Sequence, residues 1–241
     1  MMIIRMPVKV VHVPSVGEIT LIQNPRSRRI RLRVRPGRKV SVSFPLHVNC
    51  SEAVRFATLN ATWIAQQHLK IETKMPLFSE ESVFRTRLHR ITFLKAGDSF
   101  ILKKENSEFR LFIPSGHDFK ETVTREKICK VITEIYRLEA KTILPPRIAF
   151  LAGKTGLRYN KLSIRNNKTN WGSCSAGSHI SLNLNLMKLP DYLVDYVILH
   201  ELAHTKVRNH GPAFWKLLDE LTGNCGRKLA AELRKFSSSS W

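Results

Sequence analysis

Apolar and polar residues alternate along three stretches of the chain, and each stretch ends at a proline. Alternation with a period of two is typical of a strand that buries one face, because successive side chains point to opposite sides of the sheet. The predicted strands, in chain order, are 17–23, 28–35, 38–44, 83–95, 99–104, 108–113, 160–166, 170–175 and 179–186. Pro45, Pro114 and Pro190 follow the three sets, and proline cannot donate to the hydrogen bonds of a sheet. The pattern therefore predicts three small sheets.

Helical periodicity follows each set of strands. The first helix is expected over about 49–72, with Asn49 or Ser51 as its cap. A second is expected over 118–142 and should end before Pro145-Pro146, because proline removes a hydrogen bond from a helix interior. Two more helices are expected after the third set of strands. This order predicts a mixed α+β fold with a β-rich N-terminal part, and not the strict alternation of a parallel doubly wound sheet.

The first two sets of strands end in a similar way. VSVSFP precedes the first predicted helix, and FRLFIP precedes the second. This similarity fits an old internal duplication. Any two units made of a hairpin and a helix share such a pattern, however, so the sequence leaves the question of a repeat open.

The composition limits the class of protein. The chain has 241 residues, of which 43% are hydrophobic, so it can build a core and is not intrinsically disordered. No apolar run approaches the roughly 20 residues that a membrane span needs, and no N-terminal signal peptide is recognisable. We therefore expect a cytoplasmic protein without a membrane partner.

The four cysteines form no C-x-x-C pair, so reduced thiols are expected rather than a cysteine metal site.

Positive charge is concentrated near the N-terminus of this basic protein. The formal net charge is +21, and residues 1–47 hold ten basic side chains with Glu18 as the single acid. From Arg29 to Arg35, arginine alternates with Ile, Leu and Val, so a strand here would present its guanidinium groups on one face. Such a face is either simply solvated or binds an anionic partner, such as nucleic acid, a nucleotide or an acidic protein. No helix-turn-helix, zinc-finger or RNA-recognition motif accompanies it.

The sequence HELAH at residues 200–204 carries the clearest chemical signal. His200 and His204 stand one turn apart on one face of a predicted helix, a spacing at which two imidazole nitrogens can reach one Zn²⁺ at about 2.0–2.1 Å. Glu201 is rotated off this row, where a general base that acts on a metal-activated water is expected. His210 precedes a Gly-Pro pair that is typical of a helix start, so a turn can bring it back as a third ligand. Three nitrogens with an open fourth position are typical of a catalytic zinc site.

Four motifs surround or contain these histidines. They are NWGSC at 170–174, SLNL at 181–184, YVILHELAH at 196–204 and NHGPAFW at 209–215. Together they resemble the YgjP-like metallopeptidase family, which is related in pattern to SprT-like proteins. The resemblance implies a basic α+β region over 1–150 and a zincin-like catalytic domain over 151–241. It also implies a hydrolase that binds one Zn²⁺, or another divalent metal, through His200, His204 and His210 and uses Glu201 as its base.

Four further residues are candidates for substrate contact, although each also fits an ordinary packing role. Tyr196 shares the face of His200 and could donate to a transition-state oxyanion or support a ligand. Trp171 lies in a turn expected near the metal, and Arg208 is a polar group close to the third histidine in sequence. Asn183 belongs to the predicted strand 179–186. The resemblance to zincin-like folds leaves two interpretations of that strand: an ordinary amphipathic strand of a core sheet, or an edge strand beside the metal, which an extended peptide could join through backbone hydrogen bonds.

Three functions remain open at this point. A zinc peptidase is the favoured interpretation. A metal-dependent nucleotide pyrophosphohydrolase, which converts a nucleoside triphosphate to the monophosphate and pyrophosphate, would need the same metal chemistry. A DNA-associated protein with a metal site is the third, because of the positive charge. The charge favours an anionic substrate in each case, either an acidic peptide or a nucleotide, and nucleic acid is a further candidate partner.

Overall fold

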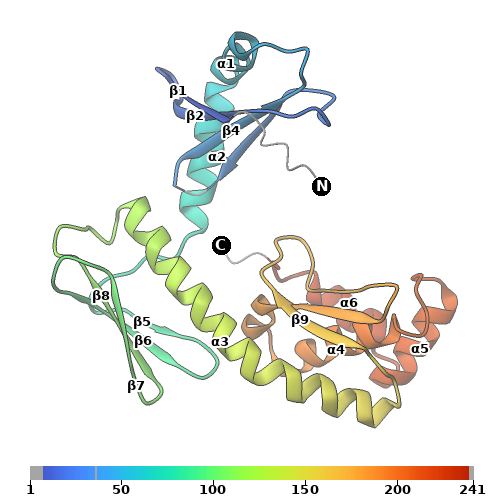
Figure 1. The fold of residues 1–241 in the computed structure, drawn as a ribbon. Coiled ribbons are helices and arrows are strands. Elements are labelled where there is room, and N and C mark those ends of the chain that lie inside the picture. Colours follow the sequence, from blue (N-terminus) through green and yellow to red (C-terminus); the bar gives the residue numbers. More distant parts are fainter. Residues whose placement is uncertain (1–7, 36, 239–241) are drawn as a thin grey trace. The chain divides into compact units, whose positions relative to one another are not determined.

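The structure is a computed structural model that describes residues 8–35 and 37–238, and these form two compact units (Figure 1). The first unit comprises 8–78 with 117–128, and the second comprises 79–116 with 129–238. Both units combine small sheets with helices, so the fold is mixed α+β with a β-rich N-terminal part, as predicted. Among the described residues, no helix has the length and apolar character needed to cross a membrane.

The first unit contains a four-stranded sheet with the order β1-β2-β4-β3. Its strands are β1 (Val8–Val13), β2 (Gly17–Gln23), β3 (Arg31–Arg35) and β4 (Lys39–Phe44). The central strands β2 and β4 are parallel, and each pairs with an antiparallel outer strand. Strand β1 was not predicted, because apolar and polar residues do not alternate regularly along it. The residues that the sheet buries in the core of this unit are Val13, Ile19, Leu21, Val40, Val42 and Phe44.

Two helices cover the buried face of this sheet, where the sequence predicted one. Helix α1 spans Cys50–Leu59 and α2 spans Ala61–Lys74. Asn49 caps α1 as expected, because its side chain accepts from the N–H of Glu52 at 2.8 Å. The break falls at Asn60, whose side-chain amide donates to the carbonyl of Phe56 at 2.8 Å. An asparagine that satisfies the preceding turn in this way competes with continuation of the helix.

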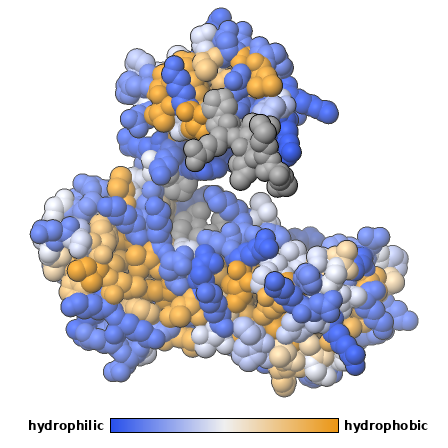
Figure 2. Space-filling model, viewed as in Figure 1, coloured by the Kyte–Doolittle hydropathy of each residue, from blue (hydrophilic) through white to orange (hydrophobic). Residues whose placement is uncertain are grey.

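The second unit begins with a sheet in the order β5-β6-β8-β7. Its strands are β5 (Val83–Arg85), β6 (Arg90–Lys95), β7 (Ile101–Glu105) and β8 (Glu108–Ile113). The single strand predicted over 83–95 is therefore a hairpin, which turns at residues 86–89. Figure 2 shows apolar residues on the visible surface over this sheet, and Leu94, Ile101 and Leu102 are among the exposed apolar side chains.

The two four-stranded sheets have the same topology. In each, the second and fourth strands are parallel neighbours and the first and third strands pair antiparallel with them. Equivalent backbone bonds close both sheets: Asn24 N–H donates to Phe44 at 2.8 Å, and Ala96 N–H donates to Ile113 at 3.0 Å. A proline follows Phe44 and Ile113 alike. This agreement supports the duplication that the sequence pattern left open.

Helix α3 (Thr122–Thr155) continues through Pro145 and Pro146, so the predicted stop before these prolines is wrong. The buried side chains Leu144, Ile148 and Leu151 lie on both sides of the prolines at helical spacing. Burial of this apolar face offsets the two backbone hydrogen bonds that the prolines remove. The domain boundary expected at residue 150 falls inside α3, and the two compact units divide the chain differently.

The third sheet has the order β10-β11-β9 and lies in the second unit. Its strands are β9 (Lys161–Arg165), β10 (Gly172–Cys174) and β11 (His179–Asn183). The predicted strand 179–186 is shorter than expected, because a 3₁₀ turn, η1, takes over at Leu184–Lys188. It is also the middle strand of its sheet, so the interpretation of it as an edge strand is wrong, and β10 and β9 form the two edges instead. The chain ends with three helices rather than two: α4 (Asp191–Ala203), α5 (Pro212–Thr222) and α6 (Gly226–Leu233).

Two arginines hold helix α4 in the second unit. Arg147 of α3 binds both carboxylate oxygens of Asp195. Arg87, from the turn between β5 and β6, donates to the carbonyls of Met187 and Leu189 and pairs with Asp191 at the start of α4. Bidentate and multiple contacts of this kind fix direction as well as position, so the orientation of α4 is set from both α3 and the second sheet.

A buried carboxylate in turn fixes the loop that carries Arg87. Glu139 of α3 is fully buried. Its oxygens accept from the hydroxyl of Thr86 at 2.5 Å, from the N–H of Leu88 at 2.9 Å, and contact His89 Nδ1 at 2.9 Å. A buried charge is tolerated only when hydrogen bonds satisfy it, and this loop supplies them.

We expect Glu139→Ala to lower the free energy of unfolding by about 3 kcal/mol, because it leaves buried donors without an acceptor. Glu134→Ala is the matched control in the same helix, since Glu134 is 65% exposed and pairs with Arg137 three residues on. That change should cost less than about 0.5 kcal/mol. Urea denaturation measures both, and equal effects of the two changes would contradict this role for Glu139.

Candidate metal centre

Helix α4 and the loop after it bring three histidines together. Pro190 is the N-terminal cap residue of α4 and His204 is its C-terminal cap residue, so His200 and His204 lie one turn apart at the end of the helix. The chain then turns, and the Gly211 N–H donates to the Asn209 carbonyl at 2.7 Å before Pro212 starts α5. This tight turn brings His210 back to the end of α4.

The three imidazole Nε2 atoms form a nearly equilateral triangle. The distances are 3.2 Å from His200 to His204, 3.1 Å from His204 to His210 and 3.0 Å from His210 to His200. Nitrogen ligands that share one tetrahedral zinc ion are about 3.3 Å apart. The donor set of three imidazole nitrogens also suits zinc. The residues at this site therefore fit a single divalent metal ion.

Hydrogen bonding within the triangle cannot satisfy all three nitrogens. His204 Nδ1 lies 3.1 Å from the carbonyl of Val207, so this nitrogen carries the proton and Nε2 presents a lone pair. Burial, followed by the neighbouring His204 and His210, lowers the pKa of His200 to about 3. Burial also lowers the pKa of His204. Both rings are therefore neutral at physiological pH, which is the form that binds a metal.

Phe214 of α5 forms the floor beneath the three rings. It is fully buried. Its ring stacks on His204 with centroids 4.4 Å apart, and it lies 4.9 Å from His200 and 4.8 Å from His210. An apolar floor of this kind restricts the rotation of all three imidazoles. The sequence did not predict this contact of Phe214 with the three histidines.

Glu201 lies beside the histidines with one carboxylate oxygen unused. Its side chain is buried, and Oε2 has no hydrogen-bond partner among the described residues. Burial raises the pKa of Glu201 to about 8. A buried oxygen without a partner is costly, so Oε2 is available to a ligand bound at this site. A cation held by the histidines would favour its ionised form.

Gly172 lets the edge strand β10 pass directly over Glu201. A Cβ added at this glycine would lie 2.6 Å from Glu201 Oε1 and 2.7 Å from its Cγ. No other residue type fits without moving the carboxylate. The motif NWGSC therefore includes a steric requirement of the site at Gly172, which is set by its contact with Glu201.

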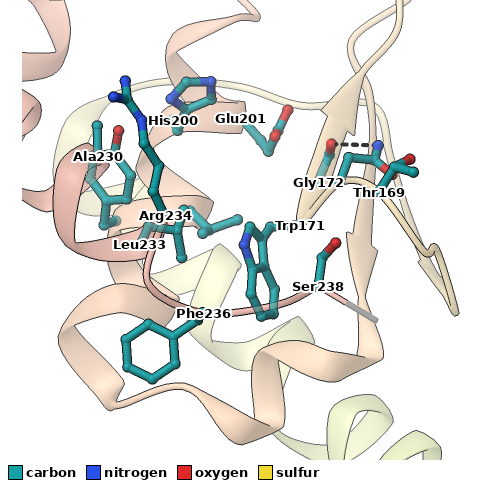
Figure 3. Close-up of a pocket in the computed structure, with 13 residues that line it drawn as sticks. Thr169, Trp171, Gly172, His200, Glu201, Ala230, Leu233, Arg234, Phe236 and Ser238 are labelled. Atoms are coloured by element: carbon teal, nitrogen blue, oxygen red, sulfur yellow. Dashed lines mark hydrogen bonds between the residues drawn. The ribbon is translucent and has the colours of Figure 1, made fainter. Parts of the chain in front are cut away.

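Two cavities meet at His200 and Glu201. The first, of about 340 Å³, runs along β10 and is lined by Gly172, Ser173, Cys174, His200, Glu201, His204, Arg208 and His210. The second, of about 380 Å³, lies on the other side of His200 and Glu201 (Figure 3). Its apolar walls include Trp171, Val197, Leu233 and Phe236, and its polar groups include Tyr196 and Arg234. In Figure 3, the Arg234 side chain extends towards His200.

Three of the four candidate substrate contacts line these cavities. Trp171 and Tyr196 line the larger one, and Arg208 lines the groove along β10. Burial raises the pKa of Tyr196 to about 12, so its hydroxyl remains a hydrogen-bond donor. Arg208 donates to the carbonyls of Ser175 and Ala176, which ties the turn after β10 to the histidine loop.

Asn183 has a different place from the one expected. It is fully buried, and its amide donates to the carbonyls of Asn167, Asn170 and Ser238 at 2.8, 2.9 and 3.2 Å. These bonds hold the segment before β10 and the end of the described chain. Asn183 therefore supports the loop that carries Trp171 and lines neither cavity. Arg234 was missed, because nothing in its sequence context links the last helix to the histidines.

Comparisons with known proteins bear on the same part of the chain. A family model described as YgjP-like, metallopeptidase domain, matches residues 28–236. Among solved structures, the chain is similar to the metallopeptidase zymogen of Pyrococcus abyssi abylysin, with 20% identity and a TM-score of 0.35. That match covers 39% of this chain and 95% of the other, and so limited a likeness carries no argument. No curated protein matches the sequence significantly.

We expect purified protein to bind one zinc ion per chain and His204→Ala to lose it, because two nitrogens cannot complete the site. His179→Ala is the control, since His179 is an exposed histidine of the neighbouring strand β11 and should leave the metal content unchanged. Elemental analysis after equilibration with zinc measures the stoichiometry. Full metal content in His204→Ala would contradict the assignment.

Proposed function

The chain belongs to the YgjP-like family, and from this premise we propose that it is a zinc-dependent peptidase. In this proposal His200, His204 and His210 hold the metal and Glu201 is the general base. The observation that carries it is that Glu201, whose Oε2 has no hydrogen-bond partner among the described residues, lines the same cavity as the triangle of Nε2 atoms. A metal bound by the three histidines would supply a Lewis acid that polarises a carbonyl and lowers the pKa of water.

Glu201 would move the proton in this reaction. Its buried carboxylate is shielded from competing water, and a base in such a setting accepts a proton from the attacking water and passes it to the leaving amine. Tyr196 is a neutral donor in the same cavity. It would donate a hydrogen bond to the oxygen on which negative charge develops.

Strand β10 offers a place for the backbone of a peptide. It lies at the end of its sheet and pairs only with β11 among the described strands. A free strand edge binds extended peptides through main-chain hydrogen bonds. Because Gly172 lies against Glu201, a peptide paired with β10 would pass the catalytic groups. This role replaces the one that the sequence assigned to residues 179–186.

The larger cavity would accept a substrate side chain next to the scissile bond. Its walls combine apolar groups with the guanidinium of Arg234. Arg208 adds a second guanidinium on the other side of the histidines. Both charges favour a substrate that carries a carboxylate, in agreement with the acidic peptide expected from the net charge.

The same two guanidinium groups support a second candidate, hydrolysis of a nucleoside triphosphate to the monophosphate and pyrophosphate. Arg208 and Arg234 flank the histidines, and arginine pairs with phosphate as well as with carboxylate. A substrate panel separates the two functions. Peptide libraries and nucleoside triphosphates are each incubated with the protein and with zinc, manganese or magnesium.

We expect Glu201→Gln to lower kcat/KM on the cleaved substrate by at least about 100-fold, because it removes the proton acceptor. Its metal content should remain that of the unaltered protein, since the three histidines are intact. The measurement combines a kinetic assay with elemental analysis. Wild-type turnover in Glu201→Gln would exclude both hydrolytic candidates as formulated, since each uses this carboxylate.

We also expect Gly172→Ala to lower kcat/KM by at least about 10-fold with the metal retained, because the new methyl group displaces the Glu201 carboxylate. Gly177→Ala is a matched control in the turn between β10 and β11. A Cβ there would have His179 Nε2 as its nearest neighbour, at 3.8 Å, which is an ordinary contact. If both substitutions left activity unchanged, the close approach of β10 to Glu201 would have no part in catalysis.

A further inference from the structure

The outward face of the first sheet carries a row of arginines on its edge strand. Arg31, Arg33 and Arg35 of β3 are all exposed, whereas Leu32 and Val34 between them are partly buried against the core of the unit. None of the ion pairs formed by the described residues involves these three arginines. Their positive charges are therefore available to a partner.

Small hydroxyl side chains continue this face across the sheet. Arg31 pairs with Ser43 and Arg33 with Ser41 in the antiparallel register of β3 and β4. Thr20 of β2 pairs with Ser41 on the other side. Because paired residues of neighbouring strands point to the same face, these hydroxyls lie beside the arginines. They leave a surface that an extended polymer can approach closely.

The fold itself does not require this charge, and the second sheet shows why. Strand β7 occupies the position of β3 in the repeated topology, and its register with β8 makes Ile101, Lys103 and Glu105 equivalent to Arg31, Arg33 and Arg35. All residues of β7 are exposed, yet this strand carries no row of like charge. The arginine row is therefore a property of the first sheet and not of the architecture.

We propose that this arginine face, formed by Arg31, Arg33 and Arg35 with Ser41, Ser43 and Thr20, binds the sugar–phosphate backbone of nucleic acid. Guanidinium groups bind phosphate oxygens in a bidentate manner, and hydroxyl side chains are common additional phosphate contacts. Alternate residues of a strand are about 6.7 Å apart, so the arginines can contact successive phosphates. Binding of this kind is independent of base sequence.

Charge complementarity extends beyond the strand. Arg26, Arg28 and Arg29 are exposed in the segment that leads into β3. Glu18 is the one acidic residue in the first 47, so little repels a polyanion. The arginines recur at the regular spacing of alternate strand residues, which suits the repeated charges of a phosphate backbone and favours nucleic acid over an acidic protein.

The test measures binding of labelled single-stranded and duplex DNA of mixed sequence by fluorescence anisotropy over a range of salt concentrations. The double variant Arg31→Ser, Arg33→Ser should bind at least about 10-fold more weakly, and the slope of log affinity against log salt should fall by about 2. The control double variant, Lys103→Ser with Lys104→Ser, removes two exposed charges from β7. It should leave both affinity and slope close to those of the unaltered protein.

Two outcomes would overturn the proposal. Equal weakening by both double variants would show that only the overall charge matters. Tighter binding of poly-glutamate than of DNA, lost in the arginine variant alone, would assign the face to acidic proteins instead. Thermal melting confirms that each variant is folded, and repetition with a metal chelator separates this surface from the hydrolytic site.

Discussion

The fixed position of helix α4 is the constraint on which the rest of the second unit depends. The last turn of this helix must direct His200, Glu201 and His204 at one point. Arg147 anchors its middle through Asp195, and Arg87 anchors its start through backbone carbonyls and Asp191. Because Glu139 in turn fixes the loop that carries Arg87, the second sheet acts as a support for the metal centre. Displacing this sheet would therefore move His200 and His204 at the other end of α4.

The metal centre conflicts with the ordinary rules for stable packing. Three imidazole nitrogens lie within 3.0–3.2 Å of one another, and a buried carboxylate oxygen beside them has no partner among the described residues. Each feature costs free energy in the folded protein. Natural proteins keep such conflicts at functional sites and offset them elsewhere. Here Phe214, Asn183 and the two arginines of the anchor hold the groups in place, and a bound cation would stabilise the arrangement further.

The sequence predicted the parts of the site that follow from local periodicity. The spacing of His200 and His204 is set by the pitch of one helix, and Gly211-Pro212 marks the turn that brings His210 back. What escaped prediction depends on contacts distant in sequence. Gly172 is required by a neighbour 29 positions away, and α3 passes through Pro145 and Pro146 because tertiary burial outweighs the local signal. The middle position of β11 likewise depends on the order of strands in the sheet, and the periodicity of a sequence does not reveal that order.

The two sheets of identical topology show how one architecture supports different roles. Their inner faces must both bury apolar residues, so Leu21, Val42 and Phe44 in one correspond to Phe93, Leu111 and Ile113 in the other. Their outer faces contribute little to folding and can therefore diverge. In the second sheet the hairpin turn supplies Arg87 to α4, and its edge strand has mixed charge. In the first, the corresponding edge strand is a row of arginines. Core packing accounts for the similarity of the two sheets but not for this difference, and the proposed binding of nucleic acid rests on that difference.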